Sequence, residues 1–288
     1  MNFPKVFKMV FGGIVTTLSV SVAALYLYQN KLVYPSWAGK AKEYVEKPTS
    51  VSYPGLNFKE FYLKTPDNIR LQCYDFPNPE SKTTIIILRP NAGNIGHSLA
   101  KINYLYHEYN ASVFIFSYRG YGYSEGTPSE QGIKTDVECI MDHIEQDEFH
   151  KQRKKVLLGT SIGGAVAIHI AYRYHHMVEG VILENTFLSV RKVIPYLIPF
   201  MQRFTSMCHE VWDSEAIISK VGPKTPFLFL NSERDEIVPS NHSLELYKLC
   251  NSSEKVLKRF PLGKHNDIVI QDGYWEAFDE FMYRYNLM

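Results

Sequence analysis

The sequence predicts an α/β fold in which helices cover both faces of a mostly parallel sheet, preceded by one membrane-spanning helix. Three observations support this prediction. An uncharged apolar segment, Met9–Tyr28, lies close to the N-terminus. Short apolar runs then alternate with amphipathic helical stretches, which is the pattern of parallel strands joined by crossover helices. A glycine-flanked serine, Ser161, stands where one such run meets the next helical stretch.

The composition is that of an ordinary globular domain. The chain has 288 residues, 45% of them hydrophobic, which is enough for a single domain with a full core. Its 31 basic and 30 acidic residues give a net charge of +1, so no nucleic-acid partner is expected. No cofactor is expected.

The four cysteines are Cys73, Cys139, Cys208 and Cys250. They lack metal-ligand spacing and are predicted to be free and mostly buried, with one disulfide possible in an oxidising lumen.

The segment Met9–Tyr28 is predicted to be an uncleaved membrane anchor. At a rise of about 1.5 Å per residue it would span a hydrocarbon core of about 30 Å. A signal peptide cleaved near the small residues Ser21–Ala23 is one alternative, and a buried core helix is another. The apolar run continues past these residues, which favours the anchor. We therefore expect a transmembrane anchor over residues 1–35 and a linker over residues 36–57.

The orientation of the anchor is not decided by charge, because basic residues flank the apolar segment on both sides. Lys5 and Lys8 precede it, and Lys31, Lys40 and Lys42 follow it. Three N-glycosylation sequons would be usable only if the C-terminal domain were lumenal; they begin at Asn110, Asn241 and Asn251. Because such sequons are common by chance, they carry little weight.

The domain expected over residues 58–288 opens with an antiparallel pair of strands. These are Phe58–Leu63 and Ile69–Phe76, joined by turn residues. The later runs are short, mostly apolar and bounded by loop residues, as buried parallel strands are. They are Thr84–Leu88, Ser112–Phe116, Val156–Leu158, Val181–Leu183, Phe227–Leu230 and Val256–Phe260.

Helical stretches fall between these runs. They are Leu99–Tyr109, Ser129–Glu145, Ala165–Tyr172 and, at the end, Tyr274–Tyr285. Residues 186–224 break the alternation, because they have helical character and a cluster of apolar side chains but no clear strand. An insertion at this point of a parallel sheet could cap the strand ends, so we expect a helical lid here.

The segment Gly159–Gly164 matches the G-x-S-x-G pattern, with a strand before it and a helix after it. A strand-to-helix turn that exposes a serine strains the backbone, and bulky side chains two residues to either side would collide. Glycine at both of those positions removes the collisions. Ser161 is therefore the predicted nucleophile, with an ordinary strand–turn–helix as the structural alternative.

Acid candidates lie in the loop after the strand Phe227–Leu230. In hydrolases built on such a turn, the acid and then the histidine follow the serine along the chain. Asp235 is the predicted acid because a carboxylate at the carboxyl end of a strand can reach the histidine. Glu233 and Glu236 are its rivals, and a solvated loop carboxylate is the structural alternative.

Only two histidines follow Asp235. His242 falls in a helical stretch and is expected on the surface, whereas His265 lies in the loop before the last helix. We predict that His265 takes the proton from Ser161, and that Asp235 fixes its tautomer and stabilises the imidazolium. The N–H of Ile162 supplies one oxyanion donor at the helix N-terminus, and the loop after the first parallel strand should supply the second.

Four motifs together resemble one known family. They are Asn91–Asn94, Tyr118–Gly126, Gly159–Gly164 and Gly263–Asp267. The combination is similar to the abhydrolase domain-containing 13 group of single-pass membrane α/β-hydrolases, and the similarity covers the whole chain. It implies an α/β-hydrolase fold with an eight-stranded sheet, a type II orientation with a lumenal catalytic domain, and a substrate that is poorly defined even within the family. Carried over position by position, the triad falls on Ser161, Asp235 and His265, and the oxyanion donors fall on Asn91 and Ile162.

The chain departs from this family at Arg89-Pro90, where members usually have His-Gly. Proline lacks an N–H and fixes φ, so the loop ahead of Asn91 could differ. Asn91 keeps its own N–H, and the donor could survive.

The expected function is hydrolysis of an ester, thioester or amide through an acyl-enzyme, on a small-molecule, lipid or acylated substrate near a membrane. A peptidase-like hydrolase is one alternative. A low-activity scaffold with a hydrolase fold is the other; the intact triad argues against it, and Arg89-Pro90 argues for it. The expected partners are the substrate and the membrane that holds the N-terminal helix.

Overall fold

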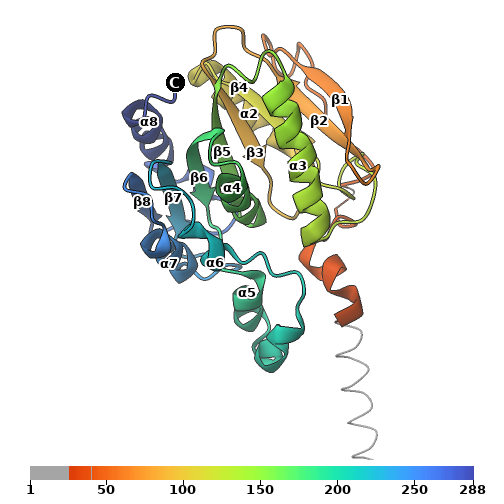
Figure 1. Cartoon of the computed structure of the whole chain (residues 1–288), viewed down its shortest axis with the longest axis vertical. Helices are drawn as coiled ribbons and strands as arrows, with labels where there is room; N and C mark the ends of the chain where they lie inside the picture. Colours follow the sequence, from red (N-terminus) through yellow and green to blue (C-terminus); the bar gives the residue numbers. More distant parts are fainter. Residues whose placement is uncertain (1–25, 40) are drawn as a thin grey trace, which may run out of the picture.

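The computed structural model describes residues 26–39 and 41–288 of the chain (Figure 1). The predicted anchor, Met9–Tyr28, lies largely outside these residues. Within the described part, no helix combines the length and the apolar character that a bilayer crossing requires. Residues 26–33 are helical, and the chain then passes through turns to the first strand.

An eight-stranded sheet forms the centre of the domain, in the order β1-β2-β4-β3-β5-β6-β7-β8. β2 pairs antiparallel with both β1 and β4, and all other neighbours pair parallel. The predicted mostly parallel sheet with an antiparallel opening is therefore confirmed. The strands are β1 Lys59–Lys64, β2 Arg70–Phe76, β3 Thr83–Leu88, β4 Ser112–Phe116, β5 Lys154–Thr160, β6 Val178–Glu184, β7 Phe227–Ser232 and β8 Lys255–Phe260.

The strand order reverses beside β3, because the chain passes from β3 to β4 on one side and then to β5 on the other. Parallel strands whose connections diverge in this way leave a crevice at their carboxyl ends, where ligands of open α/β sheets bind. The loop after β3 carries Asn91, and the turn after β5 carries Ser161. The topology thus brings two predicted site residues to one edge of the sheet.

Helices cover both faces of the sheet and bury two apolar clusters against it (Figure 1). α3, α4, α6 and α7 contribute to one cluster, while α2 and α8 contribute to the other. In α2, α3 and α8 the buried apolar side chains recur at helical spacing, so each of these helices presents one face to the sheet, whereas α4 is buried along most of its length. The bounds are α2 Leu99–Glu108, α3 Glu130–Gln146, α4 Ile162–Arg173, α6 Ser214–Ile218, α7 Asn241–Leu249 and α8 Tyr274–Arg284.

The chain between β6 and β7 forms short helical elements and no strand, as expected for residues 186–224. These elements are α5 Val190–Leu197, η2 Pro199–Met207 and the α6 already given. α5 and η2 stand off the end of the sheet, near helix 26–33 (Figure 1). α5 is short because Pro195 lies in its last turn and Pro199 follows its end. Whether this segment acts as a lid stays a prediction.

Candidate active site

Ser161 occupies a strained turn between β5 and α4. Its φ of 54° and ψ of −119° lie in a region that a non-glycine residue rarely adopts. A Cβ on Gly163 would stand 1.9 Å from the carbonyl oxygen of Leu88, so only glycine permits the close approach of this turn to β3. The Ser161 N–H donates to the carbonyl of Glu184 at 2.8 Å, and the Thr186 hydroxyl donates to the Ser161 carbonyl at 2.8 Å. The surroundings therefore hold the strained conformation.

Asp235 and His265 form a buried pair. The Asp235 Oδ2 lies 2.7 Å from the His265 Nδ1, and the two residues are 6% and 4% exposed. The other carboxylate oxygen, Oδ1, accepts the backbone N–H groups of Ile237 at 2.8 Å and Val238 at 2.7 Å. These bonds fix the carboxylate in the loop after β7. Because Nδ1 faces the carboxylate, Nε2 of the imidazole is left for another partner.

His265 and Ser161 line the same cavity, with Asp235 behind the histidine. The two rival carboxylates have other partners. Glu233 forms an ion pair with Arg259 at 2.8 Å, and Glu236 accepts the backbone N–H of His265 at 3.2 Å. The structure thus brings together the serine, the histidine and the acid that the sequence singled out.

Asn91 and Ile162 line this cavity beside Ser161. Ile162 begins α4, where the first backbone N–H groups have no partner within the helix and the helix dipole favours a negative charge. The side chain of Asn91 points elsewhere, because its amide donates to the carbonyl of Val33 at 2.8 Å. The backbone N–H of each residue is therefore the group that could bind an oxyanion.

Two tyrosines of the Tyr118–Gly126 motif hold the loop that contains Pro90. The Tyr118 hydroxyl donates to the carbonyl of Arg89 at 3.2 Å, and the Tyr121 hydroxyl donates to the carbonyl of Asn91 at 2.7 Å. These bonds fix the backbone on both sides of the proline. Pro90 itself lines the cavity.

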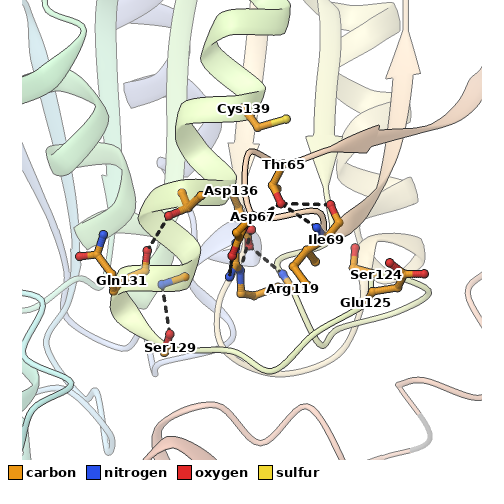
Figure 2. Close-up of polar contacts among 12 residues, drawn as sticks. Thr65, Asp67, Ile69, Arg119, Ser124, Glu125, Ser129, Gln131, Asp136 and Cys139 are labelled. Carbon is orange, nitrogen blue, oxygen red and sulfur yellow. Dashed lines mark hydrogen bonds and ion pairs between the residues drawn. The ribbon is translucent and has the colours of Figure 1, made fainter.

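Arg119, in the same motif, anchors the loop that carries the two tyrosines (Figure 2). Its backbone N–H and its Nε donate to Asp136 of α3 at 2.8 Å each, and its terminal nitrogens bind Asp67 at 2.7 and 3.0 Å. Burial raises the pKa of Asp136 to about 6 despite the arginine, whereas Arg119 lowers the pKa of the half-exposed Asp67 to about 2. Through the two tyrosines, this network links the β1–β2 turn and α3 to residues 89–94, which we call the oxyanion loop because Asn91 is predicted to supply an oxyanion donor.

The role of this network was not among the sequence predictions. A signal was present, because Asp136 lies on the buried face of α3 among apolar residues such as Ile133, Val137 and Ile140. A carboxylate at such a position needs a charged or hydrogen-bonding partner.

The cavity above Ser161 has a volume of about 390 Å³ and is mostly apolar. Its walls come from α5, η2 and helix 26–33, and none of its lining residues in the described chain is Asp, Glu, Lys or Arg. A volume of this size is within the range of small-molecule sites, roughly 300–1,000 Å³. No group of three metal-ligating side chains was found among residues 26–39 and 41–288.

His242 differs from its prediction. It is only 5% exposed, since α7 turns it inward, and burial lowers its pKa to about 4. The expectation of a surface position was therefore wrong. The prediction for the cysteines agrees with the structure, in which all four are free and three are buried.

Sequence relatives cover almost the whole chain. The family model described as serine aminopeptidase, S33, matches residues 93–222. The uncharacterized membrane protein YNL320W of Saccharomyces cerevisiae is 51% identical, over 96% of this chain and 97% of its own length. The protein bem46 of Schizosaccharomyces pombe is 37% identical over 91% and 88%, and the alpha/beta hydrolase domain-containing protein WAV2 of Arabidopsis thaliana is 33% identical over 96% and 93%.

Solved structures agree on the fold. An esterase of Pyrococcus furiosus, Pf2001, superposes with a TM-score of 0.68 at 17% identity, over 84% of this chain and 97% of its own. An alpha-beta hydrolase of Vibrio vulnificus superposes with a TM-score of 0.71 at 18% identity, over 88% and 92%. Together with the sequence relatives, these similarities show that the chain belongs to the α/β-hydrolase family.

Proposed function

We propose that this protein is a serine hydrolase that cleaves an ester or thioester of an acyl group through a Ser161–His265–Asp235 triad. The observation that carries the proposal is the buried Asp235–His265 pair, whose imidazole lines the same cavity as the strained Ser161. A carboxylate, an imidazole and a serine in this relation are the parts of nucleophilic acyl transfer.

In this mechanism Nε2 of His265 accepts the proton of the Ser161 hydroxyl while Oγ attacks the carbonyl carbon of the substrate. The resulting oxyanion is bound by the N–H groups of Asn91 and Ile162. His265 returns the proton to the leaving alcohol or thiol, which gives an acyl-enzyme. In the second half, His265 takes a proton from water, which attacks the acyl carbon; the carboxylic acid leaves, and the proton returns to Oγ of Ser161. Asp235 holds the tautomer and stabilises the imidazolium in both halves.

The cavity favours an acyl chain as the group next to the scissile bond. Its apolar walls from α5 and η2 can bury methylene groups, and burial of each contributes about 0.8 kcal/mol. The description of the matching family as an aminopeptidase favours an amide bond instead. An aminopeptidase, however, must bind a cationic amine, and no acidic side chain lines the described cavity. The peptidase alternative is therefore second to acyl-ester hydrolysis. The scaffold alternative is second because the serine, the histidine and the acid are all present at the cavity.

We also propose that the protein is held in a membrane by the segment Met9–Tyr28, in a type II orientation with a lumenal catalytic domain. The uncharged sequence of this segment supports the anchor, as does the name of the yeast relative. Membership of the abhydrolase domain-containing 13 group stays a prediction. Protection of the domain from protease in intact vesicles is the expected result, and its digestion from outside would exclude the lumenal orientation.

Labelling with a fluorophosphonate probe tests the catalytic proposal. The full-length protein in detergent should label, Ser161→Ala should not, and Ser206→Ala should label like the wild type because Ser206 is exposed and outside the cavity. Far-UV circular dichroism checks that each variant is folded. A folded wild type that stays unlabelled would refute the proposal.

A further inference from the structure

Large apolar side chains are exposed on two segments at one end of the molecule. The segment 190–207, which comprises α5, Ile198 and η2, exposes Tyr196, Leu197, Ile198, Phe200 and Met207, and helix 26–33 exposes Tyr26, Leu27, Tyr28 and Leu32. Phe200 is 71% exposed. Single exposed apolar residues are ordinary in soluble proteins, but a cluster of this kind marks an interaction surface. We call these two segments together the apolar rim.

The two parts of the apolar rim are in contact with each other. The backbone N–H of His209, just after η2, donates to the side chain of Gln29 at 2.7 Å. The ring of Tyr26 meets the ring of His209 edge to face, with centroids 5.5 Å apart. Figure 1 shows helix 26–33 and η2 at the same end of the molecule. The rim is therefore one surface, although its parts are far apart in sequence.

The charge of the apolar rim has one sign. α5 and η2 contain Arg191, Lys192 and Arg203 but no acidic residue, and helix 26–33 contains Lys31 but no acidic residue. Lys192 is paired with Glu215 at 2.5 Å, which leaves Lys31, Arg191 and Arg203 as the basic side chains without an ion pair in the described rim. Apolar side chains accompanied by basic residues are typical of segments that lie in the interface of a phospholipid bilayer.

The cavity above Ser161 lies between the two parts of the rim. Leu32 and Val33 line it from helix 26–33, and Leu197, Met201 and Phe204 line it from α5 and η2. Helix 26–33 is also tied to the oxyanion loop by the hydrogen bond from Asn91 to the carbonyl of Val33. A bilayer against the rim would thus meet the walls of the substrate cavity directly.

We propose that the apolar rim rests in the surface of a phospholipid bilayer and that the acyl substrate of Ser161 enters the cavity from that bilayer. The inference rests on the proposed function for the identity of the substrate, but the contact itself is independent of catalysis. The sequence supports the bilayer as occupant, because the uncharged residues 9–25 of the proposed anchor directly precede the rim residues of helix 26–33. The substrate class is a bilayer-resident acyl ester or acyl thioester.

Quenching by brominated lipid tests the contact without using activity. A tryptophan is introduced at Phe200→Trp or, as the control, at Tyr283→Trp, both in full-length Ser161→Ala protein. Tyr283 is 79% exposed on α8, away from α5 and η2. The proteins are reconstituted in phosphatidylcholine–phosphatidylserine vesicles whose acyl chains carry bromine, and the signal of the three native tryptophans is subtracted.

The added tryptophan at position 200 should be quenched at least twofold more than the one at position 283. Equal quenching at the two positions would overturn the proposal. If position 200 is not quenched and the protein in detergent sediments as a dimer that Phe200→Glu dissociates, the rim is an interface with a second copy of the chain, which also overturns the proposal.

A kinetic comparison tests the route of the substrate. Phe200 does not line the cavity, so Phe200→Glu should leave the hydrolysis of a short, water-soluble ester unchanged. It should lower the hydrolysis of a long-chain ester embedded in vesicles at least fivefold, whereas Tyr283→Glu should lower neither. Equal rates of Phe200→Glu and wild type on the embedded ester would refute entry from the bilayer. If the wild type cleaves neither ester, the proposed function fails, and the quenching result still decides the contact.

Discussion

Replacing Asp235 with asparagine should abolish most of the activity without unfolding the protein. The asparagine Oδ1 can still accept the N–H groups of Ile237 and Val238, so the loop should keep its shape. The NH₂ group then replaces Oδ2, 2.7 Å from Nδ1 of His265, and makes Nδ1 an acceptor. The ring proton moves to Nε2, which can no longer accept the proton of Ser161. The expected loss in kcat is about 10⁴-fold, or about 5 kcal/mol of transition-state stabilisation.

The assay is the steady-state hydrolysis of a short-chain p-nitrophenyl ester by the full-length protein in detergent. Glu236→Gln and Glu233→Gln are matched controls, because they remove neighbouring carboxylates of the same loop and should each retain more than a third of the wild-type kcat. Unfolding by urea, followed by fluorescence, should give similar midpoints for Asp235→Asn and the controls. If Asp235→Asn keeps more than a tenth of the wild-type kcat, or if a control loses as much, Asp235 does not orient the base.

Three further predictions concern the surroundings of the site. Asp136→Ala removes the buried partner of Arg119 and should lower the free energy of unfolding by about 3–5 kcal/mol. Asp67→Ala removes the half-exposed partner and should lower it by about 1 kcal/mol or less. Urea titration measures both values, and equal effects would contradict the argument from burial. Tyr121→Phe removes the hydroxyl bound to the oxyanion loop and should lower kcat about two- to tenfold with little change in KM; a change in KM alone would disprove this role. The pKa of His242 is lowered to about 4 from 6.5, so the unfolded chain takes up this proton first as pH falls. The free energy of unfolding should therefore decrease by at most about 1.4 kcal/mol per pH unit between pH 6.5 and 4, and His242→Gln should flatten that dependence in denaturation curves measured across this range.

The strands could be predicted because each is a short apolar run between loop residues. β4 has the predicted bounds, Ser112–Phe116, whereas β5 begins two residues before the predicted Val156. The reason is that Lys155 pairs in the sheet while its ammonium group bonds to the carbonyl of Lys151 at 3.0 Å. A strand end that carries charged residues is missed when strands are identified as apolar runs, although the aliphatic part of a lysine side chain can pack in the sheet. α4 likewise begins at Ile162, three residues before the predicted start, because Gly163 and Gly164 are already helical.

In the candidate site, the features that a local sequence motif determines could be predicted, whereas those that depend on contacts between distant residues could not. Ser161 could be predicted because the turn that holds it requires glycine two positions to either side, at Gly159 and Gly163. The hydrogen bond from Asn91 to Val33 joins residues 58 positions apart, and that from Tyr121 to Asn91 joins residues 30 apart. No local pattern encodes such pairings, and none indicates that helix 26–33 forms a wall of the cavity. The inward position of His242 was missed because neighbouring elements, rather than the sequence of α7, determine which face is buried.

The attachment of residues 33 and 34 to the domain sets a condition on any soluble form of the protein. The buried hydroxyl of Tyr34 donates to the buried carboxylate of Glu210 at 2.6 Å and accepts the indole N–H of Trp212 at 2.8 Å. A fragment beginning after residue 35 would leave that carboxylate short of a donor, open one wall of the cavity and free the side chain of Asn91. A soluble form that keeps its stability and its cavity should therefore retain residues 33–35, whereas a fragment that lacks them should be less stable and less active.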